Sequence, residues 1–234
     1  MGGRGATSGS GYKTFPDKAG GSHVYEGDGR SQVQFFMNNS NFDELISNMS
    51  NGDISAFRYW TTGGFMDGQQ YRGWDRMNDH LKGITQRMDD VLDNATLDKG
   101  VVVVRRTDAQ LVLGKGKTNG TLEDFNKMRG QVVKSVGAMS TGAASQGLTI
   151  GGWSPKGVEY RIHIPGGSKG AGMWIGDKRV NGWGPEQREF VVNRDTYFRV
   201  GKARYDSVRN VTVVDLHYDG LGIHDYGTSG RLNI

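Results

Sequence analysis

The stretch GPEQREFVVNR, residues 184–194, places two polar side chains, Gln187 and Glu189, at the start of an apolar, β-branched run. Such a run predicts a β-strand, in which residues two apart point to the same face. We therefore expect Gln187 and Glu189 to face one cleft, while Phe190 and Val192 turn into a core. A carboxylate beside an amide suits a reaction that develops positive charge at one atom and must orient a second reactant. A polar turn that simply enters a strand is the alternative.

The composition limits the class of protein. The chain has 234 residues, 35% of them hydrophobic, which suits one large domain or one domain with an extension. The absence of cysteine excludes a disulfide scaffold, a cysteine zinc site and a cysteine nucleophile. A net charge of +4 permits an acidic partner such as nucleic acid but does not identify one. We expect no membrane span, because no apolar run is long enough, and no signal peptide.

Periodicity divides the chain into unlike parts. Residues 1–35 are rich in Gly, Ser and Lys and predict a flexible segment, followed by a single domain over residues 36–234. Residues 40–95 carry apolar side chains at helical spacing, which predicts a set of amphipathic helices. Two of these apolar stripes are Phe42, Leu45, Ile46 and Met49, with Ser40 or Asn41 as the cap, and Tyr71, Trp74, Met77 and Leu81. The aromatic residues of this region, Trp60 among them, are interpreted as core.

The second half reads as strands. KGVVVVRRT, residues 99–107, predicts a strand buried on both faces, and VVKSVGAMST, residues 132–141, predicts another. GVEYRIHIP at 157–165 alternates, and residues 196–205 and 209–218 continue the β pattern. Helices first and strands later favour an α+β fold. The five histidines show no metal-ligand spacing and no nucleophile-elbow motif occurs, so we expect no metal and no hydrolase triad.

Two of these strands end in residues suited to chemistry. Arg105 and Arg106 close the valine strand, and a guanidinium there needs an anion, either a ligand or an ion-pair partner at the sheet edge. Ser140 and Thr141 close the next strand, where small hydroxyl residues also commonly begin a turn. For each pair, the residues alone do not decide between a functional and a structural role.

The order Arg, then Ser-Thr, then Gln-x-Glu resembles the R-S-E class of bacterial mono-ADP-ribosyltransferase exoenzymes, which includes the binary actin-modifying toxins and the Rho-modifying exoenzymes. The resemblance runs over about residues 40–220. Its other segments are YRIHIPGGSKGAGMWI, EFVVNRDTYFRV and VVDLHYDG. Gly142 stands where the family usually has a second serine, and Gln187 matches the Gln-x-Glu subgroup, either Rho-modifying-like or DNA-guanine-modifying-like.

The resemblance implies an ADP-ribosyltransferase fold, a helical N-terminal part packed on a split β-sandwich with a central NAD cleft. Arg105 would bind the NAD phosphates, with Arg106 assisting. Ser140 would hold Glu189, and Thr141 would support the strand end. Glu189 would meet the charge that develops as nicotinamide leaves. Acceptor recognition would fall to Gln187, which would orient the acceptor, and to Trp183, an exposed platform or else a rim residue over the sheet edge.

The function that follows is transfer of ADP-ribose from NAD+, as substrate, to a macromolecular acceptor, either a protein side chain or a base of DNA or RNA. The alternatives are an NAD+ glycohydrolase and a non-catalytic β-rich binding domain. For a toxin or effector of this kind we expect a monomer that acts in the cytoplasm. It would be delivered or phage-encoded, and an antitoxin is among the partners that the class allows.

Overall fold

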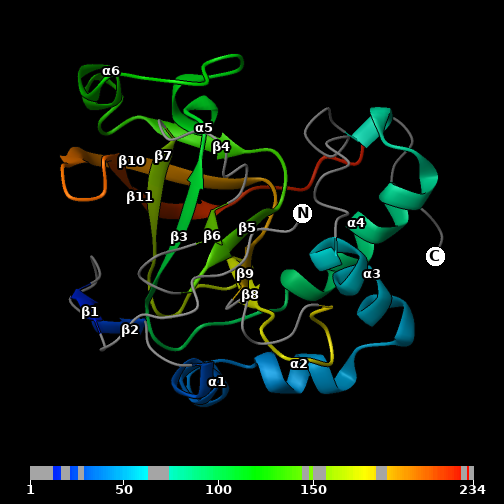
Figure 1. Ribbon diagram of the computed structural model, residues 1–234. Coiled ribbons are helices and arrows are strands. Elements are labelled where there is room, and N and C mark those ends of the chain that lie inside the picture. Colours follow the sequence, from blue (N-terminus) through cyan, green and yellow to red (C-terminus); the bar gives the residue numbers. More distant parts are fainter. Residues whose placement is uncertain are drawn as a thin grey trace.

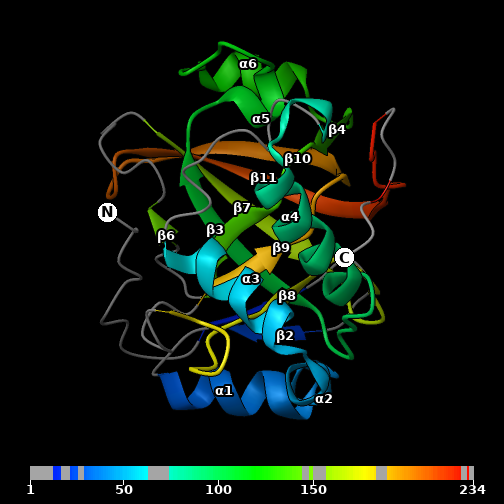
Figure 2. The ribbon, with the colours of Figure 1, turned by 90° about the vertical axis from the view of Figure 1, so that its right-hand side faces the viewer.

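The computed structural model describes residues 13–16, 22–25, 29–62, 74–143, 148–149, 157–182, 189–227 and 231. A twisted sheet stands at the centre, with one group of helices along its lower and right-hand sides and two short helices above it (Figure 1). Figure 2 shows α3 and α4 in front of the sheet and α1 and α2 below it. The α+β class predicted from the order of helices and strands is confirmed. No helix within the described residues is long and apolar enough to cross a membrane.

The first group of helices packs against the sheet. It comprises α1 (Gly29–Asn38), α2 (Phe42–Asn48), α3 (Asn51–Thr62) and α4 (Asp79–Leu92). In α2 the buried residues are Phe42 and Ile46, one helical turn apart, as the predicted stripe requires. The predicted domain boundary at residue 35 falls inside α1, and Phe36 is buried in the main core cluster.

The helix expected from the stripe that begins at Tyr71 is corrected by the structure. Trp74 lies in a short 3₁₀ helix, Trp74–Arg76, whereas Leu81 belongs to α4, and Tyr71 lies outside the described residues. Asn78 separates the two, because its backbone is extended and its side chain accepts the N–H of Leu81 as an N-cap.

The caps expected for α2 are partly confirmed. Ser40 Oγ accepts the N–H of Phe42 at 3.3 Å. The side chain of Asn41 instead accepts the N–H of Thr96 and donates to the carbonyl of Asn94, each at 2.8 Å. Asn41 therefore ties the start of α2 to the turn that follows α4.

The strands form one small hairpin and one large sheet. β1 (Lys13–Pro16) pairs with β2 (Ser22–Tyr25). The large sheet has the order β4-β10-β11-β7-β3-β5-β9-β8, with β6 added on β3. Its strands are β3 (Val101–Thr107), β4 (Val132–Ser135), β5 (Met139–Gly142), β6 (Leu148–Thr149), β7 (Val158–Ile164), β8 (Gly172–Trp174), β9 (Glu189–Val192), β10 (Thr196–Asp206) and β11 (Val211–Leu221).

The sheet is divided at β3. The four valines of β3 are buried, as the sequence predicts for a strand covered on both faces. From β3 to β5 the ladder passes through one registered pair, Val104 and Gly142, so that β5, β9 and β8 form a second part of the sheet. Two short helices, α5 (Gln110–Leu113) and α6 (Leu122–Lys127), cover the first part (Figure 1).

An aromatic cluster joins the second part of the sheet to the helices. Phe36 stacks on Trp174 with ring centroids 5.4 Å apart, and it also contacts Phe42 and Phe190. Phe190 and Val192 are fully buried, as predicted, but Val191 between them is buried too, so that β9 is covered on both faces. The strand that begins with Glu189 is thereby held on the helical part of the molecule.

Candidate functional site

Three side chains predicted to act together come together in the structure. Arg105 lies near the end of β3, Ser140 on β5, and Glu189 is the first residue of β9. The guanidinium of Arg105 donates from Nη1 to the carbonyl oxygen of Ser140 at 3.2 Å. The hydroxyl of Ser140 donates to Glu189 Oε1 in a short hydrogen bond. An arginine, a serine and a glutamate therefore form a continuous chain of contacts.

Strand register explains why these residues meet. β5 and β9 are antiparallel, with Gly142 opposite Glu189 and Ser140 opposite Val191. Directly opposed residues share a face, and so do residues two apart on one strand. Ser140 and Glu189 therefore lie diagonally on the same face, within reach of a hydrogen bond. The single β3–β5 pair at Val104 brings the adjacent Arg105 alongside.

Thr141 occupies the other side of β5. It is fully buried, and its hydroxyl donates to the carbonyl of Phe190 at 2.6 Å. Because this bond lies between two strands, Thr141 holds β5 against β9. That placement fits the role of supporting the strand end.

The environment of Glu189 perturbs its acidity. Its side chain is 2% exposed, and burial raises its pKa to about 7. The hydrogen bond from Ser140, the nearby indole of Trp60 and the charge of Arg105 oppose this rise. A carboxyl poised near neutrality beside an arginine is typical of a functional site. Once ionised, it is a fixed negative charge in a place with little water to screen it.

Trp60 is the functional residue that the sequence interpretation missed. It lies on α3, is buried with the aromatic core, and was taken as core for that reason. Its indole also lies near Glu189 and favours the ionised carboxylate, so the helical part contributes to the environment of the site. The signal was available in its residue type, since a buried indole N–H needs an acceptor.

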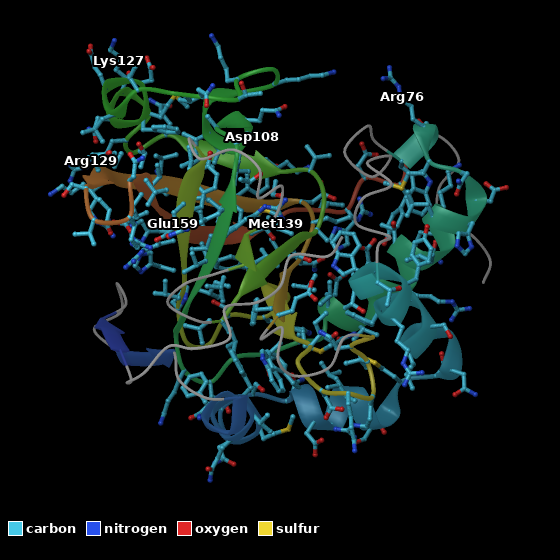
Figure 3. The ribbon with its side chains drawn as sticks, in the orientation of Figure 1. Arg76, Asp108, Lys127, Arg129, Met139 and Glu159 are labelled. Carbon is cyan, nitrogen blue, oxygen red and sulfur yellow. The ribbon has the colours of Figure 1, made fainter. Side chains whose placement is uncertain are left out.

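Arg106 points away from these residues. Neighbouring residues of a strand face opposite sides, and Arg106 lies directly across from Glu159 of β7. Its Nε donates to Glu159 Oε2 at 3.1 Å, and Arg161 and Arg209 bind the same carboxylate. Figure 3 shows Glu159 on one side of β3 and Met139 of β5 on the other. Arg106 thus forms the ion pair that the sequence had left as an alternative to a ligand contact.

The expected acceptor residues Trp183 and Gln187 lie outside the described residues. The chain is described on either side of them. Before them, the N–H of Gly182 donates to Thr61 Oγ1 on α3 at 2.9 Å. A Cβ at position 182 would overlap Thr62 Cγ2, so only glycine fits this contact. After them, the chain re-enters the sheet at Glu189.

Arg179 adds a second tie in the same region. Its guanidinium binds Asp177 and, on α2, Asp43 Oδ1 at 2.6 Å and Ser47 Oγ at 3.2 Å. The segment that leads into residues 183–188 is therefore fixed to both α2 and α3.

Solved structures share this fold at low sequence identity. "C3stau2 from S. aureus with NAD" matches at 13% identity and a TM-score of 0.60, over 89% of this chain and 98% of that one. "Plx2a, an ADP-ribosyltransferase toxin from Paenibacillus larvae" matches at 18% identity and a TM-score of 0.65, over 82% and 97%. The "ADP-ribosylating toxin BECa" of C. perfringens, solved "with NADH", matches at 14% identity and a TM-score of 0.61, over 89% and 55%.

The sequence comparison gives the family. No curated protein matches the chain as a whole. A sequence model described as "ADP-ribosyltransferase exoenzyme" matches residues 67–218, about two thirds of the chain, and this span includes Arg105, Ser140 and Glu189. The chain therefore belongs to the ADP-ribosyltransferase exoenzyme family, whose members transfer ADP-ribose from NAD+.

Proposed function

We propose that Arg105, Ser140 and Glu189 form the catalytic site of this mono-ADP-ribosyltransferase. The observation that carries the proposal is the contact chain from the Arg105 guanidinium through Ser140 to the buried carboxylate of Glu189. In this site Arg105 binds the phosphates of NAD+, for which a guanidinium has the matching charge and geometry. Its side chain is half-buried, so it keeps donors for a ligand while the other two residues are enclosed.

Glu189 acts on the ribose next to nicotinamide. As a carboxylate it accepts a hydrogen bond from a ribose hydroxyl and stabilises the positive charge that develops as the glycosidic bond to nicotinamide breaks. Ser140 holds the carboxylate in one orientation, which preserves its electrostatic effect. The electron pair of the broken bond leaves with nicotinamide, and a nucleophile of the acceptor forms the new bond to the ribose carbon.

The acceptor is a macromolecule, a protein side chain or a nucleic-acid base, recognised by Trp183 and Gln187. The Gln-x-Glu spacing supports an amide-orienting role for Gln187, and a tryptophan suits stacking on a base or packing on a protein. We infer a monomeric toxin or effector, delivered or phage-encoded, that acts in the cytoplasm of a target cell.

Incubation with NAD+ labelled in its adenylate part tests the function. The label should enter a macromolecule of a cell lysate, of purified DNA or of purified RNA. Digestion with protease or nuclease then shows which class carries it. Glu189→Gln should abolish incorporation, whereas Ser135→Ala, which changes a buried serine whose hydroxyl donates to the carbonyl of Gly137, should retain it. Free ADP-ribose with no labelled macromolecule would instead indicate an NAD+ glycohydrolase. Absence of NAD+ binding in calorimetry would refute the proposed site.

A further inference from the structure

Residues 222–227 connect the sheet to α4 and lie beyond the residues that the family model matches. The match ends at residue 218, within β11. Beyond β11 the chain, red in Figure 1, leaves the sheet and runs to α4. Two of its side chains, His224 and Tyr226, enter a cluster of charged residues between α4 and the turn that joins β9 to β10.

The imidazole of His224 lies between two carboxylates. Its Nε2 is 2.8 Å from Oδ1 of Asp93, the C-cap residue of α4, and its Nδ1 is 3.3 Å from Asp195 Oδ2 in the β9–β10 turn. The side chain is only 6% exposed. An ionised carboxylate can only accept a hydrogen bond, so both ring nitrogens must donate, and only the imidazolium does that. The geometry therefore requires a cationic His224.

Neighbouring cations complete the cluster. Arg194 binds Asp89 of α4 through Nη2 at 2.8 Å and Asp195 through Nη1 at 2.9 Å. Lys134 of β4 reaches the other oxygen of Asp195 at 2.6 Å. With imidazolium at position 224, three cations therefore face the three carboxylates. A neutral imidazole would break the ion pair with Asp93, whose side chain is 41% exposed, and leave one of the two hydrogen bonds unmade.

The remaining groups that face His224 come from its own segment and from Asn193. Tyr226 donates its hydroxyl to Asp89 Oδ2 at 3.0 Å, and the carbonyl of Asp225 accepts from Arg194 Nη1 at 3.2 Å. Asn193 Nδ2 donates to Asp93 Oδ1 at 2.9 Å. Asn193 therefore shares Asp93 with the imidazolium, and Tyr226 ties the same segment to Asp89 of α4.

This cluster adjoins the elements next to the candidate site, which are β9 on one side and α4 with its neighbour α3 on the other. The β9–β10 turn follows directly on the strand that begins with Glu189. On the other side, α4 packs on α3, which carries Trp60. A tie between α4 and the turn therefore links the helical part that carries Trp60 to the strand that begins with Glu189.

We propose that His224, as a cation, is a positioning residue that holds α4 against the β9–β10 turn and so keeps the walls of the NAD+ site together. The effect on NAD+ rests on the catalytic site proposed above, whereas the clamping of α4 does not. Raising the pH neutralises His224 and loosens the tie. The 222–227 segment is thus an alkaline-sensitive strap on the catalytic unit.

The direction of the pH effect follows from the pKa. Burial lowers the pKa of His224, but the hydrogen bonds with Asp195 and Asp93 outweigh it and raise the pKa from 6.5 to about 9. The stabilisation is thus complete below pH 6.5 and lost as the pH rises through 9. Such a shift means that protonation of His224 is favoured in the folded chain over the unfolded chain by roughly two orders of magnitude.

Three variants test the strap. His224→Gln removes the cation, His224→Lys keeps a cation whose ordinary pKa is about 10.4, and His80→Gln makes the same change at an exposed histidine of α4. At pH 7, His224→Gln should raise the KM for NAD+ roughly three- to thirty-fold with little change in kcat. The difference in melting temperature between wild type and His224→Gln should shrink between pH 7 and pH 10. His224→Lys should keep the low KM to higher pH than wild type does.

Hydrogen exchange locates the effect. At pH 7, His224→Gln should increase amide exchange in α4 and in residues 222–227, whereas His80→Gln should not. Tyr226→Phe, which removes one hydroxyl, provides a milder variant if His224→Gln does not fold, and it should raise exchange in the same two segments. Unchanged exchange in α4, or a melting-temperature difference that does not vary with pH, would overturn the strap. Increased exchange with an unchanged KM would confine the tie to stability and refute its link to the NAD+ site.

Discussion

The ionisation of Glu189 sets the acid limb of the pH–rate profile. Burial raises its pKa to about 7, and the proposed mechanism needs the carboxylate. The pH dependence of kcat/KM reports groups of the free enzyme. Nicotinamide release at low NAD+ should therefore fall about tenfold for each pH unit below 7.

Ser140→Ala should move this limb in a known direction. The serine hydroxyl donates to Glu189 Oε1 and so favours the ionised form. A hydrogen bond to a charged group contributes about 1.5–3 kcal/mol, which corresponds to roughly one to two pKa units. The limb should shift from about pH 7 to about pH 8–9. At pH 6.5 the variant should be roughly 10- to 100-fold slower than wild type, with part of the loss recovered at pH 8.5.

The assay is the initial rate of nicotinamide release between pH 5.5 and 8.5. Ser135→Ala is the matched control, because Ser135 is a buried strand-end serine bonded to the carbonyl of Gly137. It should leave the limb in place. A limb near pH 4.5 in wild type, or a Ser140→Ala profile that is parallel to wild type at every pH, would refute the assignment of the limb to Glu189.

Three further predictions concern the same site. Glu189→Gln should lower transfer by at least roughly 10²–10³ while sparing NAD+ binding. It should also melt at a higher temperature at pH 8, because a carboxyl whose pKa rises from 4.5 to about 7 on folding loses stability across that window, by about 3 kcal/mol. Equal melting temperatures would contradict the burial of the charge. Arg105→Lys should weaken NAD+ binding in calorimetry, since an ammonium cannot reproduce a two-pronged phosphate contact; unchanged affinity would remove Arg105 from the phosphate site. Thr61→Val deletes the acceptor of the Gly182 N–H and should increase free ADP-ribose relative to labelled acceptor, and an unchanged ratio would show that this tie does not position the acceptor loop.

The sequence determined the local structure and the inventory of the site. Four consecutive valines predicted a strand covered on both faces, and apolar spacing predicted α2 and α3. The apolar run of β9 predicted a strand with Phe190 and Val192 in the core, although Val191 on the other face is buried as well. Each of these follows from the period of a helix or strand, which a few neighbouring residues fix without any information on the rest of the fold.

Tertiary structure alone decided which side chains meet. Ser140 and Glu189 are 49 residues apart, and their hydrogen bond depends on the β5–β9 register, which no local pattern specifies. The same holds for Trp60, whose spacing marked it as core and which also lies near Glu189, and for Arg106, which the strand turns towards Glu159. The charge states of buried side chains could not be predicted from the sequence either. His224 lies in a polar stretch that reads as loop, yet the fold encloses it between two carboxylates, and the cost of burying a charge depends on partners brought from distant parts of the chain.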